Sequence, residues 1–195
     1  MKLLVVAPAL GPLGSGAAGG VELTLVNLVA GLLQRGHAIT VLAAEGSQLP
    51  GDCAAAALWT CSGSPQATAQ HQGREAPIAM PADGLLHRFW GRVLAEGPAA
   101  GFEAVLNLGY DWLPLWLTPT APLPLFHLVS MGSVNAAMDG AIAELARWDQ
   151  RRLAFHTASQ AADFALPQPP VLVGNGFDLS AYVFCAEPEP LLGWV

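Results

Sequence analysis

The order of segments in the first 43 residues constrains the fold more than any other feature of the sequence. Residues 3–7 form an apolar run that ends at Pro8, which predicts a short buried strand. After a glycine-rich stretch, apolar residues recur at helical spacing over 21–35, with Gly36 as the stop. Residues 38–43 then predict a second strand. A strand, a helix and a strand in this order form a right-handed crossover unit of a parallel sheet.

The alternation continues along most of the chain. Further strands are predicted at 104–108, 123–129, 153–157 and 171–173, and helices at 85–94 and 134–148. No element is predicted for 47–83, where periodicity is weak. The apolar region 104–129 is expected to hold two buried strands joined by a loop, because Asp111 and four prolines argue against a membrane helix. The predicted fold class is therefore α/β, with a Rossmann-like doubly wound parallel sheet.

Composition supports this class and excludes others. Apolar residues make up 53% of the chain and charged residues 12%, as expected where strands are buried on both faces. With a net charge of −7 and only 8 Lys and Arg residues, neither a nucleic acid nor an anionic membrane surface is an expected partner. The three cysteines, Cys53, Cys61 and Cys185, show no disulfide framework or zinc spacing, which favours a cytoplasmic location.

The glycine-rich loop before the first helix is the strongest chemical signal. Glycines let backbone N–H groups approach an anion, and a helix N-terminus adds its positive dipole end. We therefore expect Gly19, Gly20 and Val21 to bind a diphosphate; a merely flexible loop is the alternative. The stretch 14–19 also matches the dinucleotide pattern G-x-G-x-x-G, but it lies too far from the first strand, and Glu45 is too distant for the ribose-binding acid.

Two separated motifs resemble one enzyme family. Residues 19–22 (Gly-Gly-Val-Glu) and 33–43 resemble the start of the retaining glycosyltransferases of family four, which have the two-domain GT-B fold. Residues 174–179 (Gly-Asn-Gly-Phe-Asp-Leu) are similar to the signature that closes the first domain of that family. The resemblance implies a nucleotide sugar bound between two domains, transfer with retention, and no metal cofactor.

A narrower resemblance concerns the acceptor. The stretches 11–16, 110–114 and 127–133 resemble the cyanobacterial UDP-glucose:tetrahydrobiopterin glucosyltransferases. This implies UDP-glucose as the donor substrate, tetrahydrobiopterin as the acceptor and a hexosyltransferase activity. A small soluble acceptor agrees with the lack of a basic patch for reaching a membrane.

The candidate catalytic residues are His127, Ser130 and Asp111. Relatives carry a histidine at the tip of the strand ending near Ser130; here Ser130 or Met131 takes that place, and His127 could instead be a core histidine. Asp111 follows a strand, where ligands of open α/β sheets bind. The candidate acceptor-binding residues are Glu22, Tyr110, Asp111, Trp112, Ser130 and Met131. Glu22 could also only complement the helix dipole. No cluster of His, Asp or Glu predicts a metal site.

The expected domain organisation follows from the resemblance. Residues 1–177 are the acceptor-side domain, 178–190 a linker, and 191–195 the beginning of a donor-binding domain, so the 195 residues alone are expected not to transfer glucose. Two rival functions are an NAD-type oxidoreductase domain and a non-catalytic module that binds a small molecule. The sequence does not determine the oligomeric state.

Overall fold

The sheet contains seven strands, all parallel, in the order β3-β2-β1-β4-β5-β6-β7. The computed structural model describes residues 1–177, 179 and 184–187. The strands are β1 (Lys2–Val6), β2 (Ala38–Ala44), β3 (Ala57–Cys61), β4 (Ala104–Asn107), β5 (Leu125–Val129), β6 (Leu153–Phe155) and β7 (Val171–Leu172). In the register of the central pairs, Val5 lies beside Val41 of β2 and Leu106 of β4. This topology confirms the predicted doubly wound, Rossmann-like α/β fold.

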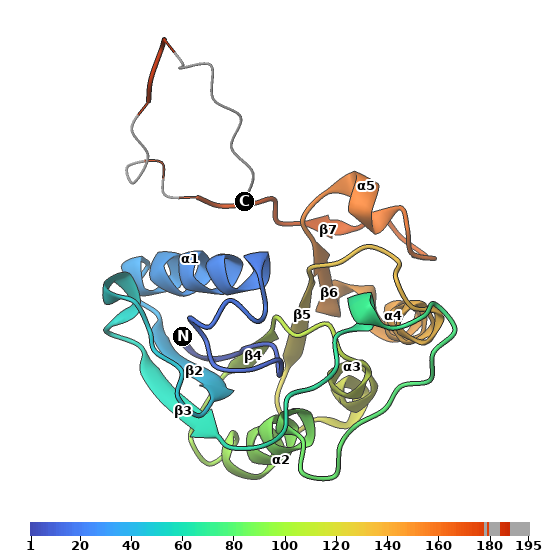
Figure 1. The fold of residues 1–195 in the computed structure, drawn as a ribbon, viewed down its shortest axis with the longest axis horizontal. Helices are drawn as coiled ribbons and strands as arrows, with labels where there is room; N and C mark the ends of the chain where they lie inside the picture. The colour runs from blue at the N-terminus through green and yellow to red at the C-terminus, as the bar shows by residue number, and fades with distance from the viewer. Residues whose placement is uncertain (178, 180–183, 188–195) are drawn as a thin grey trace.

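Helices cover both faces of the sheet (Figure 1). The α-helices are α1 (Gly20–Gln34), α2 (Leu85–Glu96), α3 (Trp112–Leu117), α4 (Ala136–Asp149) and α5 (Ala158–Ala161). Short 3₁₀-helices are η1 (Gly51–Cys53), η2 (Ala69–His71), η3 (Thr118–Thr120) and η4 (Gln150–Arg152). In β1, Leu3 and Val5 belong to the core beneath α1, whereas Leu4 and Val6 pack with the residues of α2. Because β1 is covered on both faces, its successive residues 3–6 are all apolar.

The predicted elements all form, with ends that differ by a few residues. The structure adds β3, which lies at the sheet edge and is half-exposed, within the region for which no element was predicted. It also adds α3, so that the loop expected between the strands of 104–129 is partly helical. Neither element has a clear pattern, because β3 is covered only in part and α3 has six residues with Pro114 inside it.

The direction of winding reverses at β1. From β1 the chain first crosses to β2 and β3 on one side and then to β4 and the later strands on the other. The loops that follow β1 and β4 therefore diverge at the carboxyl edge of the sheet and leave a crevice between them. Ligands of open α/β sheets bind at such a switch point.

Two further expectations concern a membrane-spanning helix and the C-terminal segment. Among the described residues, no helix is long and apolar enough to cross a membrane. The predicted linker 178–190 lies mostly outside the described residues, and the predicted beginning of a second domain at 191–195 lies wholly outside them.

Candidate functional site

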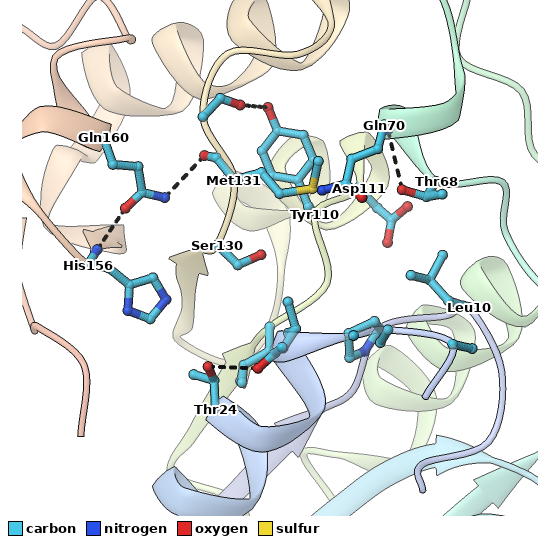
Figure 2. Close-up of a pocket in the computed structure, with 18 of the residues that line it drawn as sticks. Leu10, Thr24, Thr68, Gln70, Tyr110, Asp111, Ser130, Met131, His156 and Gln160 are labelled. Carbon is cyan, nitrogen blue, oxygen red and sulfur yellow. Dashed lines mark hydrogen bonds between the residues drawn. The ribbon is translucent and has the colours of Figure 1, made fainter. Parts of the chain in front are cut away.

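A cavity of about 680 Å³ opens at the carboxyl edge of the sheet, at the switch point. The loops after β1, β4, β5 and β6 contribute to its wall, together with the start of α1 and residues around η2 (Figure 2). Of the residues predicted to form the site, the cavity brings together Gly19, Gly20, Val21, Tyr110, Asp111, Ser130 and Met131. Glu22, Trp112 and His127 do not line it.

The amides of the glycine-rich loop are almost all paired within the chain. Those of Gly14, Gly16 and Ala18 donate to the carboxylate of Glu22, at 2.8, 3.4 and 3.1 Å. Gly19 donates to the carbonyl of Gly16. Most N–H groups of the loop that was expected to bind a phosphate therefore already donate to acceptors of the same chain.

Gly20, the first residue of α1, is the exception. Its neighbours are paired, since the amide of Val21 donates to the carbonyl of Ala18 at 3.3 Å. The amide of Gly20 has no acceptor among the described residues. A Cβ atom built on Gly20 would meet nothing within 4 Å, so the space in front of this residue is open. Of the three predicted phosphate-binding residues, Gly20 thus offers the free N–H group, at the positive end of a helix dipole.

Asp111 contributes a carboxylate that has no hydrogen-bond donor among the described residues. It occupies the N-cap position of α3, where an aspartate usually accepts from the helix amides, but its side chain makes no such bond. Gly109 allows the carboxylate to lie close to the chain, because a Cβ atom there would come within 3.0 Å of Oδ2 of Asp111. Burial raises the pKa of Asp111 to about 7. A carboxyl group of this kind exchanges a proton near neutral pH.

Tyr110, Ser130 and Met131 form the neighbouring wall. The hydroxyl of Tyr110 donates to the carbonyl of Gly132 at 3.3 Å, and burial raises the pKa of Tyr110 well above its usual range. The side-chain amide of Gln160 donates to the carbonyl of Val129 at 2.7 Å and to that of Met131 at 3.1 Å, the latter bond being visible in Figure 2. Gln160 thereby fixes the chain on which Ser130 is presented to the cavity.

Sequence reasoning missed His156, which follows β6 and lines the cavity. Its Nδ1 lies 2.9 Å from the carbonyl oxygen of Gly174, which can only accept, so Nδ1 carries the proton. The other ring nitrogen, Nε2, has no partner among the described residues. The carboxyl end of a predicted strand was the signal that could have identified His156, as it identified Asp111.

Thr68, Gln70 and His71 also line the cavity and were not predicted from the sequence, because they lie in the region without a predicted element. This connection between β3 and α2 is fixed to the beginning of α4. The side-chain amide nitrogen of Asn135 donates to the carbonyls of Gly73 and Ala76, at 3.4 and 3.2 Å. Arg74 forms an ion pair with Asp139 at 2.7 Å. These contacts join segments that are far apart in the sequence, so no local sequence pattern predicts them.

His127 lies within β5, and the structure places it in the interior of the domain, at 3% exposure. Thr118 donates its hydroxyl proton to the carbonyl of Pro114 and therefore accepts from Nε2 of His127 at 2.7 Å. Nδ1 lies 3.1 Å from the side-chain amide nitrogen of Asn107, an atom that can only donate. The ring is thus neutral and fully paired, and burial lowers the pKa of His127 to about 3. This placement favours the alternative of a core histidine over the catalytic role considered for His127.

Glu22 and Trp112 also differ from expectation. Glu22 turns toward the glycine-rich loop, as described above, rather than toward an acceptor. The ring of Trp112 stacks on that of Trp116, with centroids 5.6 Å apart and an angle of 16° between the planes. Tyr110 is therefore the aromatic residue of this loop that faces the cavity. Within the described part of the chain, no three His, Cys, Asp or Glu side chains come together as metal ligands would.

No protein-family model and no curated protein matches the chain. Among solved structures, the chain is similar to the Streptomyces sp. SF2575 glycosyltransferase SsfS6, complexed with thymidine diphosphate, at 18% identity and a TM-score of 0.46. The similarity covers 97% of this chain and 59% of that one, so the chain spans little more than half the length of its neighbour. At this identity and TM-score, the likeness assigns neither an activity nor a substrate to the chain.

Proposed function

We propose that the chain is the acceptor-side domain of a glycosyltransferase that uses a nucleotide sugar. One observation carries the proposal. Among the described residues, one cavity at the switch point of the sheet presents a helix N-terminal amide without an acceptor, that of Gly20, and a carboxylate without a donor and with a pKa of about 7, that of Asp111. The amide suits an anionic leaving group, and the carboxylate suits the removal of a proton from an acceptor.

The donor side of the proposed site lies at the beginning of α1. A diphosphate there would accept from the amide of Gly20 and lie against the backbone of Gly19 and Val21, which also line the cavity. The family resemblance of the Gly-Gly-Val-Glu motif supports a nucleotide sugar as the donor and retention of the anomeric configuration, and the narrower resemblance of 11–16, 110–114 and 127–133 supports UDP-glucose as that donor. By the same resemblance, a second domain would hold the base and the ribose.

The acceptor side lies at Asp111. The acceptor hydroxyl oxygen would form a bond to the anomeric carbon on the same face from which the diphosphate departs, while the bond from that carbon to the diphosphate breaks, so that the anomeric configuration is retained. Asp111 would take the hydroxyl proton, and UDP would leave with the electron pair of the broken bond. Tyr110 and Met131 offer apolar surface, and Thr68 and Gln70 offer polar groups to a small ring-shaped acceptor (Figure 2). The narrower resemblance supports tetrahydrobiopterin as this acceptor.

The test uses the polypeptide encoded by the complete reading frame, incubated with UDP-glucose and tetrahydrobiopterin. We expect a glucosylated pterin by mass spectrometry, with an α-configured anomeric proton by NMR, as retention from UDP-α-glucose requires. Binding of the pterin without turnover would favour the non-catalytic module instead. Quenching or enhancement of NADH fluorescence, with no binding of UDP-glucose, would favour the oxidoreductase domain.

A further inference from the structure

The carboxylate of Glu22 occupies the interior of the glycine-rich loop. Glu22 lies in the first turn of α1, and its two oxygens accept from three amides of the preceding loop. Oε2 accepts from Gly14 and Gly16, and Oε1 accepts from Ala18. Gly14 and Gly16 have positive φ angles, of 89° and 79°, which glycine adopts at little cost. The loop therefore curls around a carboxylate of its own chain.

Converging amides of this kind bind anions in many proteins. Here the anion is supplied by the protein, and a second anion at the same amides would meet a negative charge and no free N–H group. Of the loop residues that reach the cavity, Gly16 and Ala18 donate directly to this carboxylate. A carboxylate that only complemented the dipole of α1 would not need to accept from residues six and eight positions earlier in the chain.

We infer that Glu22 is a positioning residue. Its carboxylate fixes the conformation of the glycine-rich loop and accepts the hydrogen bonds of Gly14, Gly16 and Ala18, so that these amides do not bind a phosphate. The amide of Gly20 is then the one that contacts a diphosphate. The hydrogen bonds from the three amides to Glu22 do not depend on the proposed function, whereas the contact between Gly20 and a diphosphate rests on it.

Amide hydrogen exchange measures this occupancy in the 195-residue chain. In the wild type, the amides of Gly14, Gly16 and Ala18 should be protected although they lie in a surface loop. In Glu22→Ala, all three should exchange about tenfold faster or more, since each loses a charged acceptor. The isosteric Glu22→Gln should give intermediate rates, because it keeps one oxygen but lacks the charge. Glu144→Ala, on the exposed side of α4, removes the same charge elsewhere and should leave the three rates unchanged.

Titration with inorganic pyrophosphate, followed by NMR of the backbone amides, separates positioning from a general loss of structure. In the wild type we expect the amide of Gly20 to shift and those of Gly14, Gly16 and Ala18 to stay. In Glu22→Ala the three vacated amides should shift as well, because the loop then accepts an external anion.

Two results would overturn the inference. One is exchange at the three amides that stays within twofold of wild type in both Glu22 variants. The other is a wild-type loop in which Gly14, Gly16 and Ala18 respond to pyrophosphate as strongly as in Glu22→Ala. If the amides of Gly14, Gly16 and Ala18 behaved as expected but the amide of Gly20 did not shift with pyrophosphate in the wild type, the proposed donor site would be wrong. The role of Glu22 in the loop would still stand.

Discussion

Replacing Asp111 by asparagine should stabilise the protein while lowering its activity. In the wild type, burial raises the pKa of this carboxyl from its ordinary value of 3.8 to about 7. The ionised carboxylate has no hydrogen-bond donor among the described residues, so the folded state holds it at a cost. A difference of about three pH units corresponds to about 4 kcal/mol. Because the side chain is only half-buried and water screens part of the charge, we expect a gain of about 2 kcal/mol at pH 8.

The sign follows from proton uptake. Between pH 4 and pH 7 the folded protein binds a proton at Asp111 that the unfolded chain does not, so this contribution to stability falls as pH rises through that window. The advantage of Asp111→Asn should therefore be close to zero at pH 4, grow up to about pH 7, and remain constant above it.

Urea-induced unfolding of both proteins at pH 4, 6 and 8 measures this difference. Asp52→Asn, at an exposed position, is the control and should stay within about 0.5 kcal/mol of wild type. Glucosyl transfer by Asp111→Asn should fall by a factor of about 100 or more, as expected for loss of a general base. A variant that is less stable at pH 8, or a stability difference that does not change with pH, would refute the reasoning.

Three further substitutions test other parts of the site. Gly20→Val should leave the fold intact, since its Cβ atom meets nothing within 4 Å, but lower kcat/KM for UDP-glucose about tenfold or more; wild-type kinetics would exclude a donor contact at Gly20. Trp112→Ala should reduce the free energy of unfolding by about 2 kcal/mol, because it removes a stacked ring, yet leave the acceptor KM within twofold; a large rise in that KM would place Trp112 in the acceptor site after all. His127→Gln should have a lower free energy of unfolding than the wild type at pH 7. The wild type should lose about 2 kcal/mol of stability between pH 7 and pH 5, because the unfolded chain binds a proton at His127 there and the buried ring, with a pKa of about 3, does not. The variant should lack this loss. Parallel pH profiles of this variant and the wild type in urea unfolding would contradict that account.

The sequence alone was sufficient for the fold class and for most of the sheet. The strands and helices with a strong apolar pattern were predicted because they are buried against neighbours, and burial leaves a period in the sequence. The half-exposed edge strand β3 and the short helix α3 lack such a period and were missed. Asp111, Ser130 and Tyr110 were predicted to lie together because they follow buried strands, and all parallel strands end at the same edge of the sheet, where these residues line the cavity.

What the sequence could not decide was the direction and pairing of polar side chains. His127 and Asp111 are both polar residues next to apolar runs, yet the first is enclosed by Asn107 and Thr118, whereas the second lies in the cavity with no hydrogen-bond donor in the described part of the chain. Glu22 was expected to meet an acceptor but fills the glycine-rich loop. The sequence thus determined the parallel sheet and the edge at which the site lies, because periodicity and strand order depend on local and repeated patterns. The tertiary structure alone decided which amides and carboxylates are paired, because pairing depends on the direction of each side chain and the path of each loop, which the apolar pattern of the sequence does not specify.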